Sequence, residues 1–191
     1  MDQLFVKYPH PSPVYRAGRF ADRCHAGQVR KYTGVDYIEH PIAVATMVSK
    51  VTGDQDVIAA ALLHDVVEDC SVSVYQISQR FGNKVAAFVG WLTHVDPLEG
   101  EPRAARKARD RDKLLRAPAE VKTIKLADMI HNSETIIKYD PKFAIVFMME
   151  MKKLLGVLET GDPGLYAQAD KIVQDYYDAR GQESPWLALP R

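Results

Sequence analysis

Apolar residues recur at intervals of three and four along most of the chain, and short polar stretches separate the runs. This spacing places apolar side chains on one face of a helix. It predicts helices over 14–26, 41–53, 54–69, 73–81, 82–93, 119–138, 141–159 and 165–180, and a basic segment predicts a further helix over 104–115. No stretch alternates apolar and polar residues over the length of a strand. The pattern therefore predicts an all-α fold of eight or nine helices.

The segment 54–69 differs from the others because its apolar residues cover all sides of the expected helix. Asp54 fits an N-cap, and a continuous apolar run from Val57 to Leu63 follows it. A helix that is apolar on all sides is normally buried. We therefore expect this helix at the centre of the domain.

Turn residues separate the helices and outline one domain. Ser12-Pro13 predicts a helix start, 27–39 is a loop rich in glycine and charge, and Gly161-Asp-Pro-Gly164 is a clear break. The length of 191 residues favours one domain over two. We expect a single domain over 1–191 with a core at about 13–180 and a C-terminal tail over 181–191.

Charge and cysteine content limit the class of protein. Lys and Arg number 25 and Asp and Glu also number 25, so no net charge attracts nucleic acid or an anionic membrane. The basic run 103–111 lacks interleaved aromatic residues, and we interpret it as a solvated face that could steer anions. Cys24 and Cys70 do not form a disulfide framework, and no segment resembles a signal peptide or a membrane span. These features predict a cytoplasmic protein that binds neither membrane nor nucleic acid.

Four ionisable residues stand at the end of the apolar helix, in the stretch His64-Asp65-Val-Val-Glu68-Asp69. Residues three and four apart share a helix face, so this stretch directs an imidazole and three carboxylates into one region. Burying these charges without partners would cost several kcal/mol each, and a divalent metal would satisfy them. Mixed nitrogen and oxygen donors suit Mn²⁺, Fe²⁺ or Zn²⁺ better than Ca²⁺. A His-Asp pair is common, however, and the carboxylates could simply cap a helix end.

Two further segments support the metal hypothesis. His40 stands at the start of a helix, after Tyr37-Ile-Glu. Asp128 lies inside an apolar helix, three residues after Lys125 and one turn before Asn132. A buried aspartate requires a partner, and a metal would provide one.

The order His40, His64-Asp65, Asp128 resembles the H…HD…D ligand pattern of the HD phosphohydrolase superfamily. The resemblance is closer to the hydrolase domain of RelA/SpoT-type alarmone enzymes and covers about residues 15–140. It rests on five stretches: His25-Ala-Gly-Gln-Val-Arg-Lys31, Tyr37-Ile-Glu-His-Pro41, Ala61-Leu-Leu-His-Asp-Val-Val-Glu-Asp69, Phe81-Gly82 with Val85, and Lys125-Leu-Ala-Asp128 with His131-Asn132. The length leaves no room for the synthetase and regulatory domains of the long enzymes, so the chain is similar to the stand-alone small alarmone hydrolases.

The resemblance implies a metal-dependent 3′-pyrophosphohydrolase that acts on guanosine 3′,5′-bispyrophosphate (ppGpp or pppGpp) and releases pyrophosphate with GDP or GTP. It implies that His40, His64, Asp65 and Asp128 bind one Mn²⁺, although other divalent transition metals would fit. It also implies that the acidic pair Glu68 and Asp69 orients and deprotonates the attacking water.

The same resemblance implies contacts to a nucleotide substrate. Arg30 would stack on the base, Lys31 and Lys125 would meet phosphate, and Asn132 would bond to the ribose or base. Each has an alternative reading: Arg30, Lys31 and Lys125 could be solvated, and Asn132 could only support a ligand. We interpret His25 as structural and assign no role to His10, His94 or His131.

Met129, Glu134 and Cys70 depart from the residues that the family usually has at these positions. They leave the ligand set intact but open the question of substrate. Adenosine alarmones (ppApp or pppApp), the 2′-phosphate of NADPH, or binding without catalysis are the alternatives. A binding module would be expected to lack ligands or the acidic pair, and all six residues are present. We expect a monomer or a weak homodimer.

Overall fold

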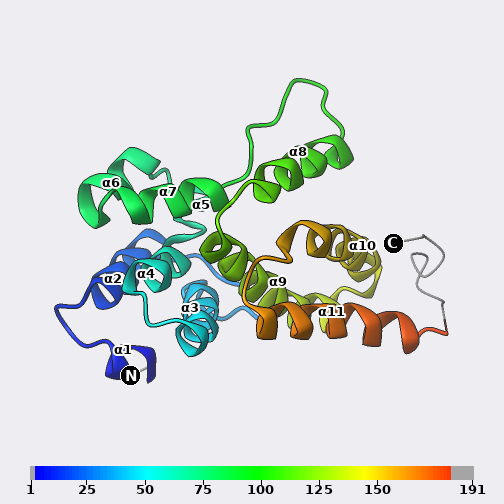
Figure 1. Ribbon diagram of the computed structural model, residues 1–191, viewed down its shortest axis with the longest axis horizontal. Coiled ribbons are helices and arrows are strands. Elements are labelled where there is room, and N and C mark those ends of the chain that lie inside the picture. The colour runs from blue at the N-terminus through cyan, green and yellow to red at the C-terminus, as the bar shows by residue number, and fades with distance from the viewer. Residues whose placement is uncertain (1–2, 182–191) are drawn as a thin grey trace.

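The computed structural model describes residues 3–181, which form eleven helices joined by turns and loops (Figure 1). They are α1 (Gln3–Lys7), α2 (Pro13–Cys24), α3 (Glu39–Val51), α4 (Gln55–Leu63), α5 (Val66–Asp69), α6 (Val74–Phe81), α7 (Asn83–Leu92), α8 (Arg103–Leu115), α9 (Ala119–Tyr139), α10 (Pro141–Leu158) and α11 (Pro163–Asp178). The predicted all-α class is confirmed. Apart from Gly181, the predicted C-terminal tail lies outside the described residues.

Two differences raise the number of helices above the predicted eight or nine. Helix α1 was not predicted, because five residues are too few for a helical period to be recognised. The expected single helix over 54–69 is instead two, α4 and α5, separated by His64 and Asp65. Ring atom Nδ1 of His64 lies 2.8 Å from the Ala61 carbonyl oxygen and competes for this backbone acceptor at the helix end.

Side-chain caps start several of the helices where the sequence predicts. The Ser12 hydroxyl accepts the backbone N–H of Tyr15, and the Asp54 carboxylate accepts that of Asp56. Ser73 and Gln76 form a reciprocal capping box at the start of α6. These bonds satisfy N–H groups that have no partner within their own helix.

Helix α4 forms the centre of the domain, as its all-round apolar sequence predicts. Every residue from Val57 to Leu63 is at most 1% exposed. The helix packs against α2, α3, α7 and α9. Because α4 is held in the core and ends at Leu63, the positions of the next two residues, the buried His64 and the half-buried Asp65, are fixed.

Helices α8, α9, α10 and α11 form the second half of the domain (Figure 1). Helix α9 packs against α3, α10 and α11, and it thus connects this half to the core. Helix α8 lies over α10, after the long loop 93–102 (Figure 1). None of the described helices combines the length and apolar character needed to cross a membrane.

Gly161, in the turn between α10 and α11, has no room for a side chain. A Cβ atom there would lie 2.8 Å from Cδ1 of Leu126 and 3.2 Å from the Leu158 carbonyl oxygen. We expect Gly161→Ala to lower the free energy of unfolding by about 1–3 kcal/mol, because the backbone must shift to relieve the overlap. Thermal or urea unfolding of the purified protein measures this effect.

The matched control is Gly156→Ala, in the exposed part of α10, where an added Cβ meets nothing within 4 Å. We expect it to raise stability by about 0.5–1 kcal/mol, because alanine loses less backbone entropy in a helix. Equal effects at the two glycines would show that packing around Gly161 is looser than described.

Candidate metal centre and adjoining cavity

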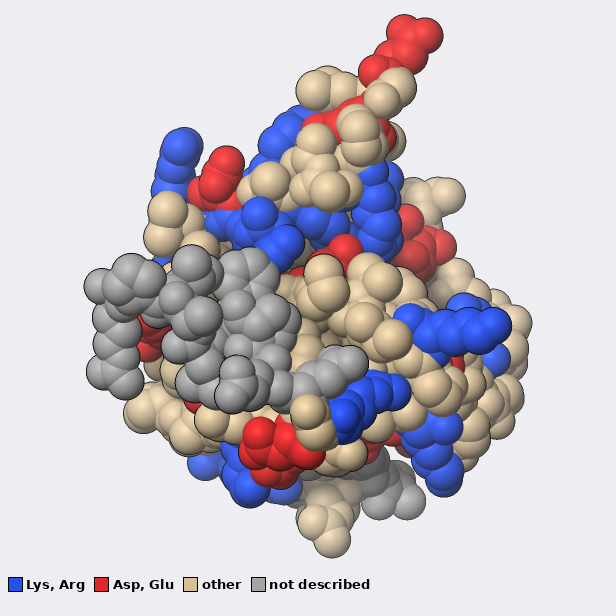
Figure 2. All heavy atoms as spheres, turned by 90° about the vertical axis from the view of Figure 1, so that its right-hand side faces the viewer, with Lys and Arg blue, Asp and Glu red and all other residues tan. Residues whose placement is uncertain are grey.

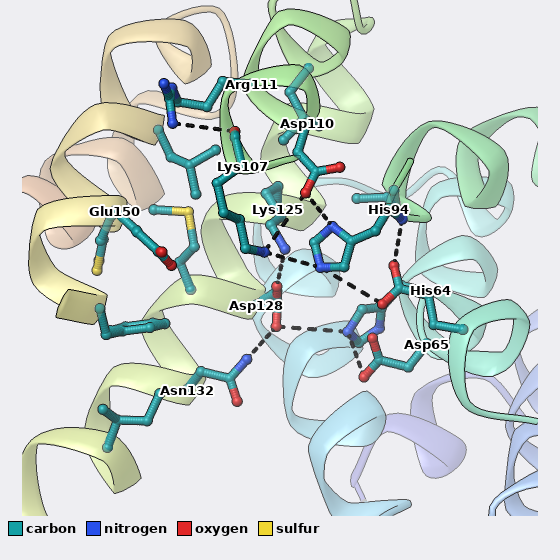
Figure 3. A pocket seen from close by; sticks show the side chains of 18 of the residues that line it. His64, Asp65, His94, Lys107, Asp110, Arg111, Lys125, Asp128, Asn132 and Glu150 are labelled. Atoms are coloured by element: carbon teal, nitrogen blue, oxygen red, sulfur yellow. Dashed lines mark hydrogen bonds and ion pairs between the residues drawn. The ribbon is translucent and has the colours of Figure 1, made fainter. Parts of the chain in front are cut away.

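The four predicted ligands come from three separate parts of the chain; donor atoms of His40, His64 and Asp65 all lie within 4.8 Å of one another, and Asp128 adjoins the two histidines. His40 lies in the first turn of α3, His64 and Asp65 lie between α4 and α5, and Asp128 lies within α9. Nε2 of His40 is 3.2 Å from Oδ1 of Asp128 and 3.6 Å from Oδ2 of Asp65. Nε2 of His64 is 3.2 Å from Oδ2 of Asp65 and 3.8 Å from Oδ1 of Asp128 (Figure 3). Donors that share a metal at about 2.0–2.2 Å lie roughly 3 Å apart, so the spacing suits one ion.

Hydrogen bonds prepare both imidazoles to donate a lone pair at Nε2. The Ala61 carbonyl oxygen can only accept, so Nδ1 of His64 carries a proton and Nε2 is the nitrogen that faces Asp65 and Asp128. Burial opposes protonation of this ring, but the two carboxylates raise its pKa, so a metal would displace a proton from Nε2. Nε2 of His64 is buried and has no hydrogen-bond partner among residues 3–181. Nδ1 of His40 lies 2.7 Å from Nδ1 of His131, which orients the His40 ring in the same way. A ring that is fixed through its other nitrogen is typical of a metal-binding histidine.

The charges of the cluster call for a cation at its centre. Burial alone would raise the pKa of Asp128, but the charge of Lys125 and bonds to the two imidazoles bring it well below its usual range. Burial likewise opposes ionisation of Asp65, and the His64 ring reverses that effect and lowers its pKa. Burial lowers the pKa of His40 and favours its neutral form. The two ionised carboxylates and the neutral His40 ring suit a divalent metal, which would have to displace the proton that the carboxylates favour on His64.

A second layer of side chains holds the ligands. Nζ of Lys125 donates to Oδ2 of Asp128 at 2.7 Å, and the Asn132 amide donates to Oδ1 at 2.7 Å. The Tyr37 hydroxyl donates to Oδ2 of Asp65 at 2.7 Å. Burial and the charge of Asp65 raise the pKa of Tyr37, so this hydroxyl remains a donor. Lys125 is thus bonded to a ligand rather than solvated.

A cavity of about 310 Å³ opens beside the four predicted ligands (Figure 3). One wall is charged and includes Glu68 with Arg103, Lys107 and Arg111 of α8. The apolar part of the lining consists of Leu92, Leu114, Met129, Ile136, Phe143, Phe147, Met151 and Leu154, and most of these residues belong to α9 and α10. Such a cavity suits a ligand that has anionic groups at one end and a flat or apolar body at the other.

The position of α8 corrects the interpretation of its basic run as a solvated face. Arg103, Lys107 and Arg111 stand four residues apart and share the helix face that lines the cavity. Basic side chains gather over the upper part of the molecule seen in Figure 2, where α8 lies. Arg103 is paired with Glu150, which also lines the cavity, so Lys107 and Arg111 are the members of the run that supply positive charge there.

The predicted substrate contacts divide into two groups. Asn132 and Lys125 line the cavity. Arg30 and Lys31 are not among the described residues that line it. Arg30 nevertheless stays close, because its guanidinium donates to Oδ1 of Asn132 at 2.8 Å. Lys31 lies apart: its side chain is 75% exposed and its ammonium is 3.6 Å from Asp140.

The two members of the acidic pair face different surroundings. Glu68 lines the cavity, and its Oε1 accepts the backbone N–H of His94 at 2.7 Å. Asp69 is not among the described lining residues, and it faces Tyr37 and Asp65 instead. Burial, and then the charge of Asp65, raise the pKa of the Asp69 carboxyl. Glu68 is therefore the better placed of the two to meet a ligand.

His131 and His94, to which the sequence assigned no role, both belong to the site. His131 contacts His40, and burial together with the neighbouring His40 lowers its pKa to about 4. Its position three residues after Asp128 on α9 could have indicated that role. His94 lines the cavity next to Glu68, and no local pattern marks it, because it lies in the loop after α7.

Comparison with known proteins identifies the family. The HD domain family model matches residues 17–146. The chain is 37% identical over 132 residues to a probable guanosine-3′,5′-bis(diphosphate) 3′-pyrophosphohydrolase of Synechocystis, which covers 68% of this chain and 17% of that protein. It is 36% identical over 140 residues to the guanosine-3′,5′-bis(diphosphate) 3′-pyrophosphohydrolase of Aquifex aeolicus, covering 71% and 20%. The chain thus spans about a fifth of the length of these relatives.

Two solved structures share the fold. A metazoan orthologue of SpoT, described as hydrolysing ppGpp, superposes with a TM-score of 0.78 at 27% identity, over 91% of this chain and 99% of that one. A Listeria monocytogenes protein superposes with a TM-score of 0.64 at 23% identity, over 78% of this chain and 99% of that one, which supports the fold alone. The matched region contains all four converging ligands, and the chain belongs to the HD domain family.

Proposed function

We propose that the chain is a Mn²⁺-dependent 3′-pyrophosphohydrolase that converts ppGpp or pppGpp to GDP or GTP and pyrophosphate. The observation that carries this proposal is the convergence of His40, His64, Asp65 and Asp128 beside a cavity with one cationic and one apolar wall. The named activities of the Synechocystis and Aquifex relatives and of the metazoan SpoT orthologue support it. We further propose that the enzyme is cytoplasmic and acts as a monomer or weak homodimer.

The residues of the cavity divide the work of hydrolysis. His40, His64, Asp65 and Asp128 would hold the cation, which would supply Lewis acidity to acidify water and polarise a phosphoryl oxygen. Glu68 takes the proton of the attacking water at Oε2, and Asp69 helps to orient the ligand cluster from behind. Water oxygen bonds to the phosphorus attached to ribose O3′, the P–O3′ bond breaks, and O3′ takes up a proton. Lys107 and Arg111 balance the negative charge of the pyrophosphate group.

The apolar wall gives the purine a place to bind. Met129 and Ile136 of α9 and Phe143 and Phe147 of α10 offer a surface that excludes water from a flat ring. Asn132 lies between this wall and the metal ligand Asp128, where it meets the ribose, and Arg30 reaches the same end through Asn132. Lys31 lies beside Asp140 and is not among the described lining residues, so its predicted phosphate contact stays a prediction, and Lys125 acts on phosphate only indirectly, through Asp128.

The three residues that depart from the family pattern, Met129, Glu134 and Cys70, differ in their position relative to the cavity. Met129 lines the cavity, whereas Glu134 is exposed and is not among its described lining residues. Cys70 contacts His25, at 3.3 Å from Nδ1, outside the described lining. Met129 is therefore the departure that could alter base selection, and it supports adenosine alarmones as alternative substrates. We favour the guanosine compound because the Synechocystis and Aquifex relatives are named for its hydrolysis.

A side-by-side product assay tests the proposal. Mn²⁺-loaded protein is incubated with ppGpp, ppApp and NADPH, and the products are separated by ion-exchange chromatography. We expect GDP and pyrophosphate from ppGpp with the highest kcat/KM. A tenfold higher kcat/KM for ppApp, about 1.4 kcal/mol of transition-state preference, would reassign the substrate. Binding without any product would reassign the protein as an alarmone-binding module.

Lys107 provides a test of the cationic wall. Burial and the nearby charge of Lys125 lower the pKa of Lys107, which means that they disfavour its charged form. An anion bound in the cavity would stabilise that charged form. We expect Lys107→Met to raise KM for ppGpp about tenfold, with a smaller change in kcat. Arg106→Met is the control, because Arg106 lies on the same helix but is not among the described lining residues. A KM that rises equally in both variants would indicate only a loss of long-range attraction.

A further inference from the structure

Glu68 is held in the cavity by a residue far from it along the chain. The backbone N–H of His94 donates to Oε1 of Glu68 at 2.7 Å. The ring of the same residue places Nε2 at 3.8 Å from Oε2. Helix α5 has only four residues, so it cannot by itself fix the direction of the Glu68 side chain. His94 therefore contacts both oxygens of the carboxylate from one side.

Asp110 of α8 fixes the His94 ring in turn. Its Oδ2 is 2.9 Å from Nδ1 of His94 (Figure 3), and its Oδ1 accepts the backbone N–H of Val95 at 2.9 Å. The Asp110 side chain is only 7% exposed. Burial opposes its ionisation, but the interactions with His94 and Val95 prevail and lower the pKa of Asp110 to about 2. The contact with His94 is a close ion pair rather than an aligned hydrogen bond, because Oδ2 of Asp110 has no hydrogen-bond partner among the described residues. An ionised Asp110 still favours a proton on Nδ1, the nearer ring nitrogen, which leaves Nε2 to face the cavity.

Lys107 completes the arrangement. Its Nζ lies 3.4 Å from Nε2 of His94 and 3.8 Å from Oδ2 of Asp110. A lysine ammonium can only donate, so Nε2 accepts from it. The groups that face the His94 ring are thus Asp110, Glu68 and Lys107. Because Nε2 accepts from Lys107, it makes no hydrogen bond to Glu68, and His94 holds that carboxylate through its backbone N–H.

We infer that His94 is a positioning residue for the hydrolytic reaction: held by Asp110, it aims the Glu68 carboxylate at the attacking water and connects Glu68 to the cationic wall through Lys107. The inference rests on the proposed function, because it assigns to Glu68 the role of general base. A correctly aimed base is worth far more than a loosely held one, since small displacements of a reacting group lower rates strongly. The alternative is that the same contacts only anchor the loop 93–102.

His94→Gln and Asp110→Asn distinguish positioning from anchoring. Gln retains the backbone N–H but lacks the ring, and Asn retains the shape of Asp110 but loses its charge. We expect His94→Gln to lower kcat at least tenfold, with KM, Mn²⁺ affinity and Tm close to those of the wild type. We expect the double variant to be no slower than His94→Gln alone, because the two residues act as a unit. His10→Gln, the same substitution at an exposed residue distant from the cavity, is the matched control.

A spectroscopic measurement tests the same arrangement without substrate. Two-bond ¹⁵N–¹H correlations at pH 9 report which nitrogen of His94 carries the proton, and we expect Nδ1–H in the wild type and a loss of this preference in Asp110→Asn. If no nucleotide is hydrolysed, the proposed function fails. The tautomer measurement would still show whether Asp110 determines which nitrogen of His94 carries the proton.

Three outcomes would overturn the inference. One is an Nε2–H tautomer in the wild type. Another is a wild-type kcat in His94→Gln. The third is a parallel loss of kcat, Mn²⁺ affinity and Tm, which would assign His94 to loop anchoring.

Discussion

Replacing Glu68 with Gln is expected to lower kcat for the 3′-pyrophosphate by a factor on the order of 10³, within the range that general bases contribute. Glutamine has nearly the same shape, and its carbonyl still accepts the His94 N–H, but it cannot take a proton from water. The affinities for Mn²⁺ and for nucleotide should change by less than about twofold, because Glu68 is not one of the four converging ligands. Single-turnover kinetics and equilibrium binding measure the two quantities separately.

Asp69→Asn provides the comparison, because Asp69 faces Tyr37 and Asp65 rather than the cavity. We expect a smaller loss of kcat in this variant, together with a change in Mn²⁺ affinity through Asp65. A larger loss of kcat in Asp69→Asn than in Glu68→Gln would exchange the roles of the two residues. Wild-type turnover in the double variant would remove both from the mechanism.

Replacing His64 with Ala is expected to abolish the stabilisation that Mn²⁺ gives to the wild-type protein. His64 provides a buried Nε2 that has no hydrogen-bond partner among the described residues and faces Asp65 and Asp128, and the remaining donors cannot replace it. An ion that binds only the folded state stabilises it by about 4 kcal/mol at a thousandfold excess over its Kd. We therefore expect Tm to rise by several degrees with Mn²⁺ in the wild type and to stay constant in the variant, with activity lost.

His25→Ala is the matched control for this experiment. His25 is also buried, but it bonds to Gln28 and lies outside the ligand cluster. Both variants should lose intrinsic stability, and only His25→Ala should retain the rise in Tm with Mn²⁺. Retention of the full rise in His64→Ala would show that the ion binds elsewhere.

The metal hypothesis arose in the sequence from ionisable residues that are costly to bury, and the complete donor set came from the resemblance to the HD phosphohydrolases. A carboxylate inside the apolar helix 119–138 needs a partner, and the same is true of the ionisable residues that follow the apolar run 57–63. These local costs single out Asp128, His64 and Asp65 before any fold is known. The burial of α4 follows from the same reasoning, since apolar residues cover all its sides.

The remaining parts of the cavity depend on contacts between distant segments. A basic helix that faces water and one that faces a hydrated cavity have the same pattern, so Lys107 and Arg111 could not be told from solvated residues. The role of His94 depends on how the loop 93–102 packs against Asp110 of α8. The separation of Arg30 from Lys31 likewise arises from two distant partners, Asn132 and Asp140.

The dispersal of the ligands over α3, the α4–α5 junction and α9 has a consequence for the folding kinetics of the chain. His40 and Asp128 are about 90 residues apart, and holding two such points together costs an unfolded chain roughly 4 kcal/mol of conformational entropy. The complete donor set therefore exists only after the three helices have assembled, so the ion binds late rather than nucleating the fold. Interactions that form after the transition state act mainly on the unfolding rate. Metal binding should therefore slow unfolding and leave the folding rate nearly unchanged. The ion would then contribute mainly to the kinetic stability of the folded protein.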